Sequence, residues 1–113
     1  MKIEHYSFGS ITIDGKTYTS DVIIYPEKVD SLWWRKEGHY LHIADLKDVI
    51  NVKPGVLIIG TGYSGAMVVP EETISYIKTQ NIEVHIARTE KAVELFNKFQ
   101  RSKKTVAALH LTC

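Results

Sequence analysis

The stretch VLIIGTGYSG, residues Val56–Gly65, has the spacing that most directly suggests chemistry. Gly60, Gly62 and Gly65 follow an apolar run at the GxGxxG spacing of dinucleotide-binding proteins. In those proteins the glycines let the backbone approach a pyrophosphate, and a helix begins inside the motif. Here that helix would contain Pro70, which lacks a backbone donor and clashes with the preceding turn. We therefore expect no dinucleotide site.

The residues near these glycines are more consistent with a modest anion site. The strand expected over residues 82–87 is followed by Arg88, not by the acid that binds ribose in dinucleotide folds. Carboxyl ends of parallel strands form the usual ligand crevice, so the glycine loop would meet Arg88 and a helix N-terminus at Thr89 there. Alternatively, the glycines only allow a sharp turn and close packing of the chain that follows. The candidate ligand-binding residues are Gly60, Thr61, Gly62, Tyr63, Ser64, Arg88 and Thr89.

A second candidate surface is the segment Trp33–Trp34–Arg35. Adjacent residues of an extended chain point to opposite sides, so one tryptophan can fill the core while the other faces outward. Tryptophan and arginine are enriched among the residues that dominate protein interfaces. We therefore name Trp33, Trp34 and Arg35 as candidate partner-binding residues. The alternative is that loops of the same domain cover both tryptophans.

The five histidines and the single cysteine do not predict a metal site. His39 and His42 are three apart in an extended segment, without the further ligands of a zinc site. His110 lies three residues before Cys113, and this pair would be a candidate base and nucleophile only if the chain end folded against the domain. Ser64 lacks the GxSxG spacing of a nucleophile elbow. We expect no catalytic residue, metal or cofactor.

Composition limits the partners. The 113 residues carry 14 basic and 13 acidic side chains, a formal net charge of +1, so no basic face for nucleic acid is predicted. No apolar run is long enough to span a bilayer, and the start of the chain lacks the apolar segment of a secretory signal. We expect a cytoplasmic protein with a protein partner, no nucleic acid and no membrane. The sequence does not define its oligomeric state.

Local patterns predict the elements that must position these residues. The opening residues read as β-strands, with a tight hairpin turn at Asp14–Gly15 that brings the strand over residues 5–13 against the chain up to Tyr25. From Asp45, a good N-cap, helices and strands alternate. Helices are expected from Asp45 to Pro54, from Pro70 to Asn81 and after an N-cap at Thr89, with strands over 56–60, 82–87 and 105–111.

This alternation predicts one α/β domain, residues 1–113, built on a largely parallel sheet. The chain contains, in order, the motifs Trp34–Arg35, LIIGTGYSG, Pro70 opening a helix, IKTQNIEV, TEKAVELFN and HLTC. Together these motifs resemble a small Mth-type domain family of unknown function, which includes the adipogenesis-associated domain protein and mitochondrial assembly factors of respiratory complex I.

The resemblance implies a mixed, mostly parallel central sheet with flanking helices and an N-terminal β-hairpin layer. It implies no catalytic residues, since none are established for the family, and action through protein partners. We therefore expect a non-catalytic protein-interaction or assembly module. The alternative is a small-ligand or anion-binding protein, conceivably an enzyme, that uses the glycine loop.

Overall fold

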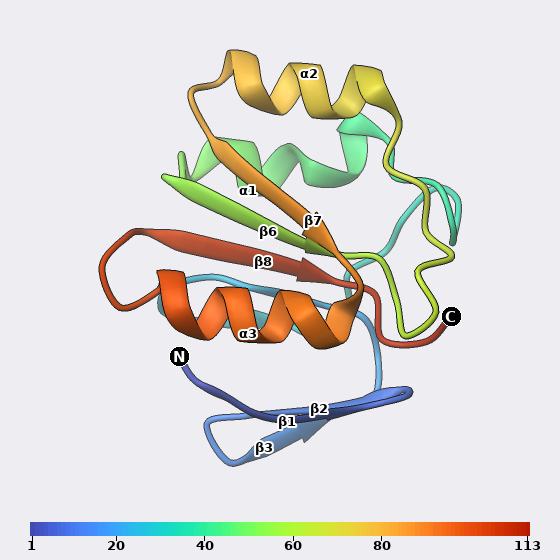
Figure 1. Ribbon diagram of the computed structural model, residues 1–113, viewed down its shortest axis with the longest axis vertical. Coiled ribbons are helices and arrows are strands. Elements are labelled where there is room, and N and C mark those ends of the chain that lie inside the picture. The colour runs from blue at the N-terminus through green and yellow to red at the C-terminus, as the bar shows by residue number, and fades with distance from the viewer.

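A mixed five-stranded sheet forms the centre of the protein (Figure 1). The computed structural model describes residues 1–113. The strands of this sheet are β4 (Val22–Ile24), β5 (Val29–Asp30), β6 (Val56–Gly60), β7 (Glu83–Ala87) and β8 (Thr105–Leu109). Their order is β5–β4–β8–β6–β7, with β7, β6 and β8 parallel and β4 antiparallel to both β8 and β5. The expected α/β fold with a mixed central sheet is confirmed, although two of the four neighbouring strand pairs are antiparallel where a mostly parallel sheet was expected.

A separate antiparallel sheet forms the N-terminal layer, with the strands β1 (Ile3–Ser7), β2 (Ser10–Ile13) and β3 (Lys16–Tyr18). The predicted turn is confirmed: Asp14 and Gly15 connect β2 to β3 with φ angles of 47° and 81°. Two expectations were wrong. The chain reverses at Gly9, where φ is 76°, so residues 5–13 form two strands. The chain also leaves this layer before Val22, because β4 pairs with β8.

Three α-helices and one 3-10 turn pack on the central sheet, namely η1 (Ile43–Leu46), α1 (Lys47–Asn51), α2 (Glu71–Thr79) and α3 (Thr89–Phe99). Pro70 stands just before α2, and Asn81 follows its end with a φ of 61°, as predicted. Asp45 does not cap a helix from outside: it lies within η1 and accepts hydrogen bonds from the backbone N–H groups of His42 and Lys36. No helix begins in residues 61–69, so the helix that a dinucleotide motif needs is missing.

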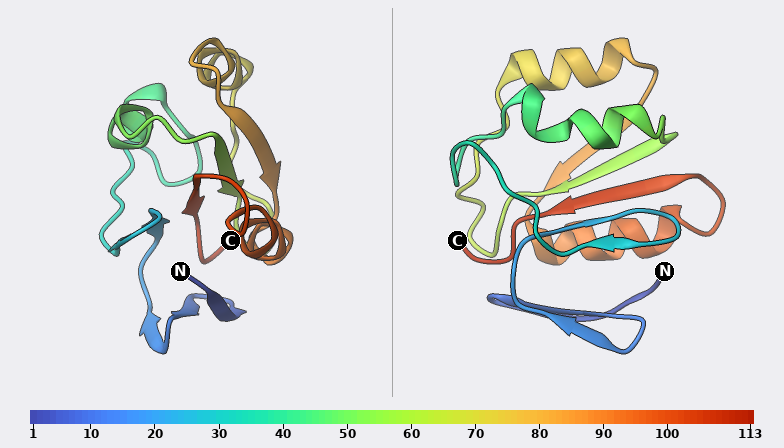
Figure 2. Two further views of the ribbon diagram at one scale, coloured as in Figure 1. Left: turned by 90° about the vertical axis from the view of Figure 1, so that its left-hand side faces the viewer. Right: turned by 180° about the vertical axis from the view of Figure 1, so that it is seen from behind.

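Two apolar clusters lie on the two faces of the central sheet. In Figure 1, α1 and α2 lie above the sheet, and α3 with the N-terminal layer lies below it; Figure 2 shows the same layers from two other sides. Strand β6 is buried along its whole length. Leu57 and Ile59 belong to the cluster with Ile77 of α2, whereas Val56 and Ile58 belong to the cluster with Phe96 of α3. The apolar run of β6 reflects burial on both faces.

The topology brings three loops to one edge of the sheet. The chain passes from β6 through α2 to β7, and then through α3 back across β6 to β8. Since β6, β7 and β8 are parallel, the loops that follow Gly60, Ala87 and Leu109 lie side by side at their carboxyl ends. This edge is where an open α/β sheet usually binds ligands. None of the helices has both the length and the apolar character that a membrane crossing needs.

Candidate functional site

Thr89 lies at the centre of this edge and joins the three loops. Its side chain is fully buried, and its hydroxyl donates to the main-chain oxygen of His110 at 2.6 Å. The hydroxyl oxygen of Thr89 in turn accepts the Gly62 N–H at 2.9 Å, and the Thr89 N–H donates to the Gly62 oxygen at 3.1 Å. Thr89 was expected to be a helix N-cap, but it is the first residue of α3 and uses its hydroxyl between loops. Thr89 therefore holds the three loops together by hydrogen bonds made inside the domain.

The glycine loop holds the last residues of the chain. The Tyr63 N–H donates to the Thr112 oxygen at 2.7 Å. The Ala66 N–H and the Ser64 hydroxyl converge on the main-chain oxygen of Cys113, at 2.8 and 2.7 Å. Backbone donors that the anion hypothesis needed are thus engaged by the protein itself. The segment that approaches the loop closely is the chain's last residues, whereas the alternative role of the glycines expected close packing of the chain that follows them.

Gly62 is required for this approach. Its φ is 109°, a conformation that residues with a side chain rarely adopt. A Cβ at this position would lie 2.6 Å from the Cys113 oxygen and 2.8 Å from the Cδ2 atom of His110, which is too close for either contact. The second glycine of the motif therefore admits the chain's own backbone and a histidine ring in place of a pyrophosphate.

Arg88 lies beside the loop, as the topology argument predicted. Its exposed side chain packs against Gly65, with Cγ 3.4 Å from the position of a Cβ there. A shallow pocket of about 360 Å³ opens next to it. The pocket is lined by Tyr63, Arg88, Glu90, Lys91 and Glu94. The two glutamates offset the positive charges of Arg88 and Lys91, which an anion would need for binding.

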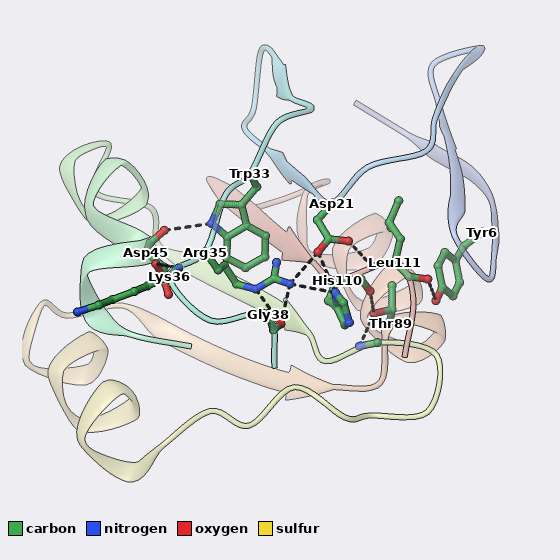
Figure 3. A network of polar contacts seen from close by, with 11 residues as sticks. Tyr6, Asp21, Trp33, Arg35, Lys36, Gly38, Asp45, Thr89, His110 and Leu111 are labelled. Atoms are coloured by element: carbon green, nitrogen blue, oxygen red, sulfur yellow. Dashed lines mark hydrogen bonds and ion pairs between the residues drawn. The ribbon is translucent and has the colours of Figure 1, made fainter. Parts of the chain in front are cut away.

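A buried network of three charged or titratable side chains lies behind the loop, and sequence reasoning missed it (Figure 3). One oxygen of Asp21, Oδ2, lies 2.8 Å from Nη2 of Arg35 and 2.8 Å from Nδ1 of His110. Its other carboxylate oxygen accepts the Leu111 N–H at 2.7 Å. Arg35 also donates from Nε and Nη2 to the oxygen of Gly38. Asp21 reaches His110 because the start of β4 pairs with the end of β8.

The hydrogen bonds of Asp21 decide its charge and the tautomer of His110. Burial by itself opposes ionisation, but hydrogen bonds from His110, the Leu111 N–H and Arg35 together hold the pKa of Asp21 below its usual value. Nδ1 of His110 lies 2.8 Å from Oδ2 of Asp21 and 3.1 Å from Nη2 of Arg35. The shorter contact is with an ionised carboxylate, which only accepts, so Nδ1 carries the proton and donates it to Asp21. This assignment leaves Nε2 of neutral His110 with a lone pair. Both Nε2 of His110 and Nη1 of Arg35 are buried without a hydrogen-bond partner.

The tryptophan segment divides between core and surface. Trp33 is buried, donates its indole N–H to the Asp45 oxygen at 3.1 Å, and has the Arg35 guanidinium 4.6 Å from its ring centroid. Trp34 is 76% exposed, so the prediction that the two rings face opposite ways is confirmed. Arg35, named as a candidate partner-binding residue, is only 9% exposed, because the ion pair with Asp21 draws it inward. The exposed neighbour of Trp34 is Leu32, at 80%.

Three of the other histidines make surface pairs or ring contacts. His42 pairs with Glu37 and His85 with Glu83. The ring of His39 lies 5.3 Å from that of His110, centroid to centroid. Among residues 1–113, no three His, Cys, Asp or Glu side chains are grouped so that they could hold a metal ion.

Comparison with solved structures shows the same fold in other proteins. The chain is similar to the conserved hypothetical protein PH1505 from Pyrococcus horikoshii OT3, with 28% identity, a TM-score of 0.85 and full coverage of both chains. It is also similar to an outer membrane protein from Bartonella henselae, with 22% identity and a TM-score of 0.81 over 98% of this chain and 94% of that one. A third similar structure is a Mth938-like domain from Bordetella pertussis, with 17% identity and a TM-score of 0.77 over 97% and 85% of the two chains.

The identities to the last two proteins are low enough that these structures support the fold alone. The family comparison covers nearly the whole chain, since residues 3–111 match a family described as a protein of unknown function (DUF498/DUF598). The resemblance to the small Mth-type domains is thereby confirmed. With its fold and nearly all of its residues matched, the chain belongs to the DUF498/DUF598 family of proteins of unknown function.

Proposed function

We propose that this protein is a non-catalytic protein-interaction module whose contact surface is centred on Leu32 and Trp34. The observation that carries the proposal is the exposure of these two apolar side chains, 80% and 76%. Exposed tryptophan beside exposed leucine is a feature of interaction surfaces, where tryptophan often dominates the binding energy. An assembly role, which the family resemblance implies, is one form of this function.

The segment that presents Trp34 is held rigidly before any partner binds. The Trp33 indole is anchored on Asp45, and its backbone N–H donates to the Asp21 oxygen at 3.3 Å. Arg35, on the other side of Trp34, is buried in its ion pair with Asp21. Since the backbone on both sides of Trp34 is ordered already, binding a partner would cost little conformational entropy in this segment.

The surroundings of Trp34 indicate the chemistry of the partner. A groove of about 470 Å³ runs beside it and has Ile23 and Trp33 in its lining. Asp30 and Asp48 also line the groove and make no ion pair, although Lys36 and Lys47 lie in the same lining. The partner that fits is a protein segment with an apolar side chain for the groove and a lysine or arginine for the two carboxylates.

The negative charges of Asp30 and Asp48 also affect the neighbouring residue Tyr25. Tyr25 adjoins a second hollow that has Asp30 and Asp48 in its lining. The pKa of Tyr25 lies above its ordinary value, mainly because the side chain is partly buried and also because of the charges of Asp48 and Asp30. A cation placed near these carboxylates would therefore gain favourable electrostatic energy.

The test compares Trp34→Ala with Phe8→Ala, a matched control in which an aromatic side chain of 56% exposure is removed from the N-terminal layer. Proteins that the wild type retains and Trp34→Ala loses are identified by mass spectrometry. The affinity of each variant for their binding segments is then measured by calorimetry. We expect Trp34→Ala to weaken binding at least about tenfold and Phe8→Ala to leave it unchanged. Equal affinity of the wild type and Trp34→Ala would contradict the proposal.

The charge complementarity is tested separately with Asp30→Asn and Asp48→Asn. Each variant should weaken binding of a lysine- or arginine-containing segment, and the loss should shrink as salt is added. An unchanged affinity would remove the cationic requirement while leaving the role of Trp34 intact.

A second candidate function is small-ligand or anion binding at the glycine loop. One observation favours it, the position of Arg88 against Gly65. Since the Tyr63 and Ala66 N–H groups are bound to Thr112 and Cys113, an anion there has to displace the end of the chain. Titration with inorganic phosphate, followed through the amide resonances of Tyr63 and Ala66, tests this function. No shift at millimolar phosphate would speak against it.

A further inference from the structure

Cys113 is the only cysteine of the chain, and it is both exposed and held in place. Hydrogen bonds from Ser64 and Ala66 fix its main-chain oxygen, and the bond from Tyr63 fixes the residue before it. The condition under which His110 and Cys113 would form a base and nucleophile pair, a chain end folded against the domain, is therefore met. Thiol reactivity requires exposure and a nearby group that stabilises or creates the thiolate.

His110 supplies a second, independent observation at the same place. It is 95% buried, since its exposed fraction is 5%, and its Nε2 atom has no hydrogen-bond partner. The position of a Cβ on Gly62 marks where the two residues meet: it lies 2.8 Å from Cδ2 of His110 and 2.6 Å from the Cys113 oxygen. Cδ2 is bonded to Nε2, so the unpartnered edge of the ring lies on the Cys113 side of the network, whereas Nδ1 faces Asp21.

The charges around His110 suit a base. Asp21 accepts the Nδ1 proton and so keeps the lone pair on Nε2, which is the arrangement by which a carboxylate orients a histidine base. Arg35 balances the charge of Asp21 by binding the same carboxylate oxygen, Oδ2, and its Nη2 atom lies 3.1 Å from Nδ1 of His110. The other titratable groups that face this region are His39, through its ring contact with His110, and Arg88, which lies along the glycine loop.

We propose that Cys113 is a reactive thiol that forms mixed disulfides with low-molecular-weight disulfides, with His110 as its base and Asp21 as the positioning residue. The exposed thiol turns about its Cα–Cβ bond toward Nε2, which takes its proton. The thiolate sulfur attacks one sulfur of the disulfide R–S–S–R, a bond forms between Cys113 and that sulfur, and the R–S–S–R bond breaks. The leaving thiolate RS⁻ then receives the proton from His110. The disulfide is the oxidant, so the step needs no other reagent.

The test uses the whole chain and oxidised glutathione. The rate of mixed-disulfide formation is measured by mass spectrometry at about pH 7 and about pH 10, the latter above the ordinary thiol pKa. His110→Asn keeps a side-chain N–H for Asp21 and removes Nε2, so we expect a rate at least about tenfold slower than that of the wild type at about pH 7. At about pH 10 solvent generates the thiolate in both proteins, and the two rates should converge.

Cys113→Ser gives the blank, because the chain has no other thiol. Lys98→Ala, an exposed change on the outer side of α3, should react like the wild type. If His110→Asn does not fold, the rates of Asp21→Asn and the wild type are compared at the same two pH values, since Asp21→Asn removes the carboxylate that orients the ring. Equal rates for the wild type and His110→Asn at about pH 7 would overturn the proposal. A slower rate for His110→Asn that persists at about pH 10 would also overturn it, because His110 would then only hold the last residues of the chain in place. Neither result bears on the Trp34 surface, which is tested by partner binding.

Discussion

Asp21 holds together three parts of the protein that are far apart in the sequence. Its carboxylate accepts from Arg35, His110 and the Leu111 N–H, and thereby links the tryptophan segment to the end of the chain. A carboxylate that is largely removed from water is tolerated only when its acceptor capacity is used in this way. Asp21 thereby holds Arg35, the neighbour of Trp34, and Leu111, two residues before Cys113, so it links the surroundings of the two proposed sites.

Asp21→Asn should destabilise the protein by about 2 kcal/mol at neutral pH, because it removes the charge that pairs with buried Arg35. The pKa of Asp21 is lower in the folded state than its ordinary value of 3.8. Its contribution is therefore present above pH 3.8 and is lost as the pH falls below that value toward the folded-state pKa. Urea unfolding of both proteins between neutral and strongly acidic pH measures this effect. The gap between their free energies of unfolding should narrow in acid, and a constant gap would contradict the assignment.

At the scale of elements, the glycine loop between β6 and α2 serves as a cradle for the chain's own backbone. Three donors from Tyr63, Ser64 and Ala66 reach main-chain oxygens of residues 112 and 113. The motif spacing is that of a phosphate loop, but the helix that would complete it begins only after Pro70. The loop therefore has the close backbone approach of such motifs without their helix dipole.

Gly62→Ala separates the need for close approach from the need for a positive φ. Gly15→Ala is the matched control, since Gly15 has a φ of 81° but no atom within 4 Å of a Cβ there. We expect about 1–2 kcal/mol of destabilisation from backbone strain at Gly15 and a larger loss at Gly62, where the new methyl group meets Cys113 and His110. Hydrogen exchange should also speed up at the Tyr63 and Ala66 amides in Gly62→Ala alone. Equal losses in the two variants would show that the contact with Cys113 adds nothing.

At the scale of the whole molecule, β6 joins the two apolar clusters into one folding unit. Leu57 packs in the cluster with α2, and Ile58 packs in the cluster with α3 and the N-terminal layer. Neighbouring residues of one strand cannot lose order separately, so damage to either cluster should affect both.

Leu57→Ala and Ile58→Ala should each lower the free energy of unfolding by about 2–5 kcal/mol, since both side chains are fully buried. In each variant, unfolding followed by tryptophan fluorescence and by far-ultraviolet circular dichroism should give coincident transitions. Two separate transitions in Ile58→Ala would show that the N-terminal layer and α3 unfold independently of the rest.

Local sequence determines most of the elements of this protein. The apolar run of β6 predicts a strand covered on both faces, Pro70 and Asn81 mark the ends of α2, and Asp14–Gly15 predicts a hairpin turn. Each of these signals depends on residues close together in the chain, where backbone preference and periodicity act directly. Among the strands, the mistakes fell at Gly9 and before Val22, where the choice of partner strand is not local.

Only the tertiary structure decided the contents of the candidate site. Asp21 and His110 are 89 residues apart, and Arg35 and His110 are 75 apart. No periodicity links residues at such separations; they meet because β4 pairs with β8 and because three parallel strands end at one edge. For the same reason the glycine motif could be recognised in the sequence, but not the backbone oxygens of Thr112 and Cys113 that occupy it.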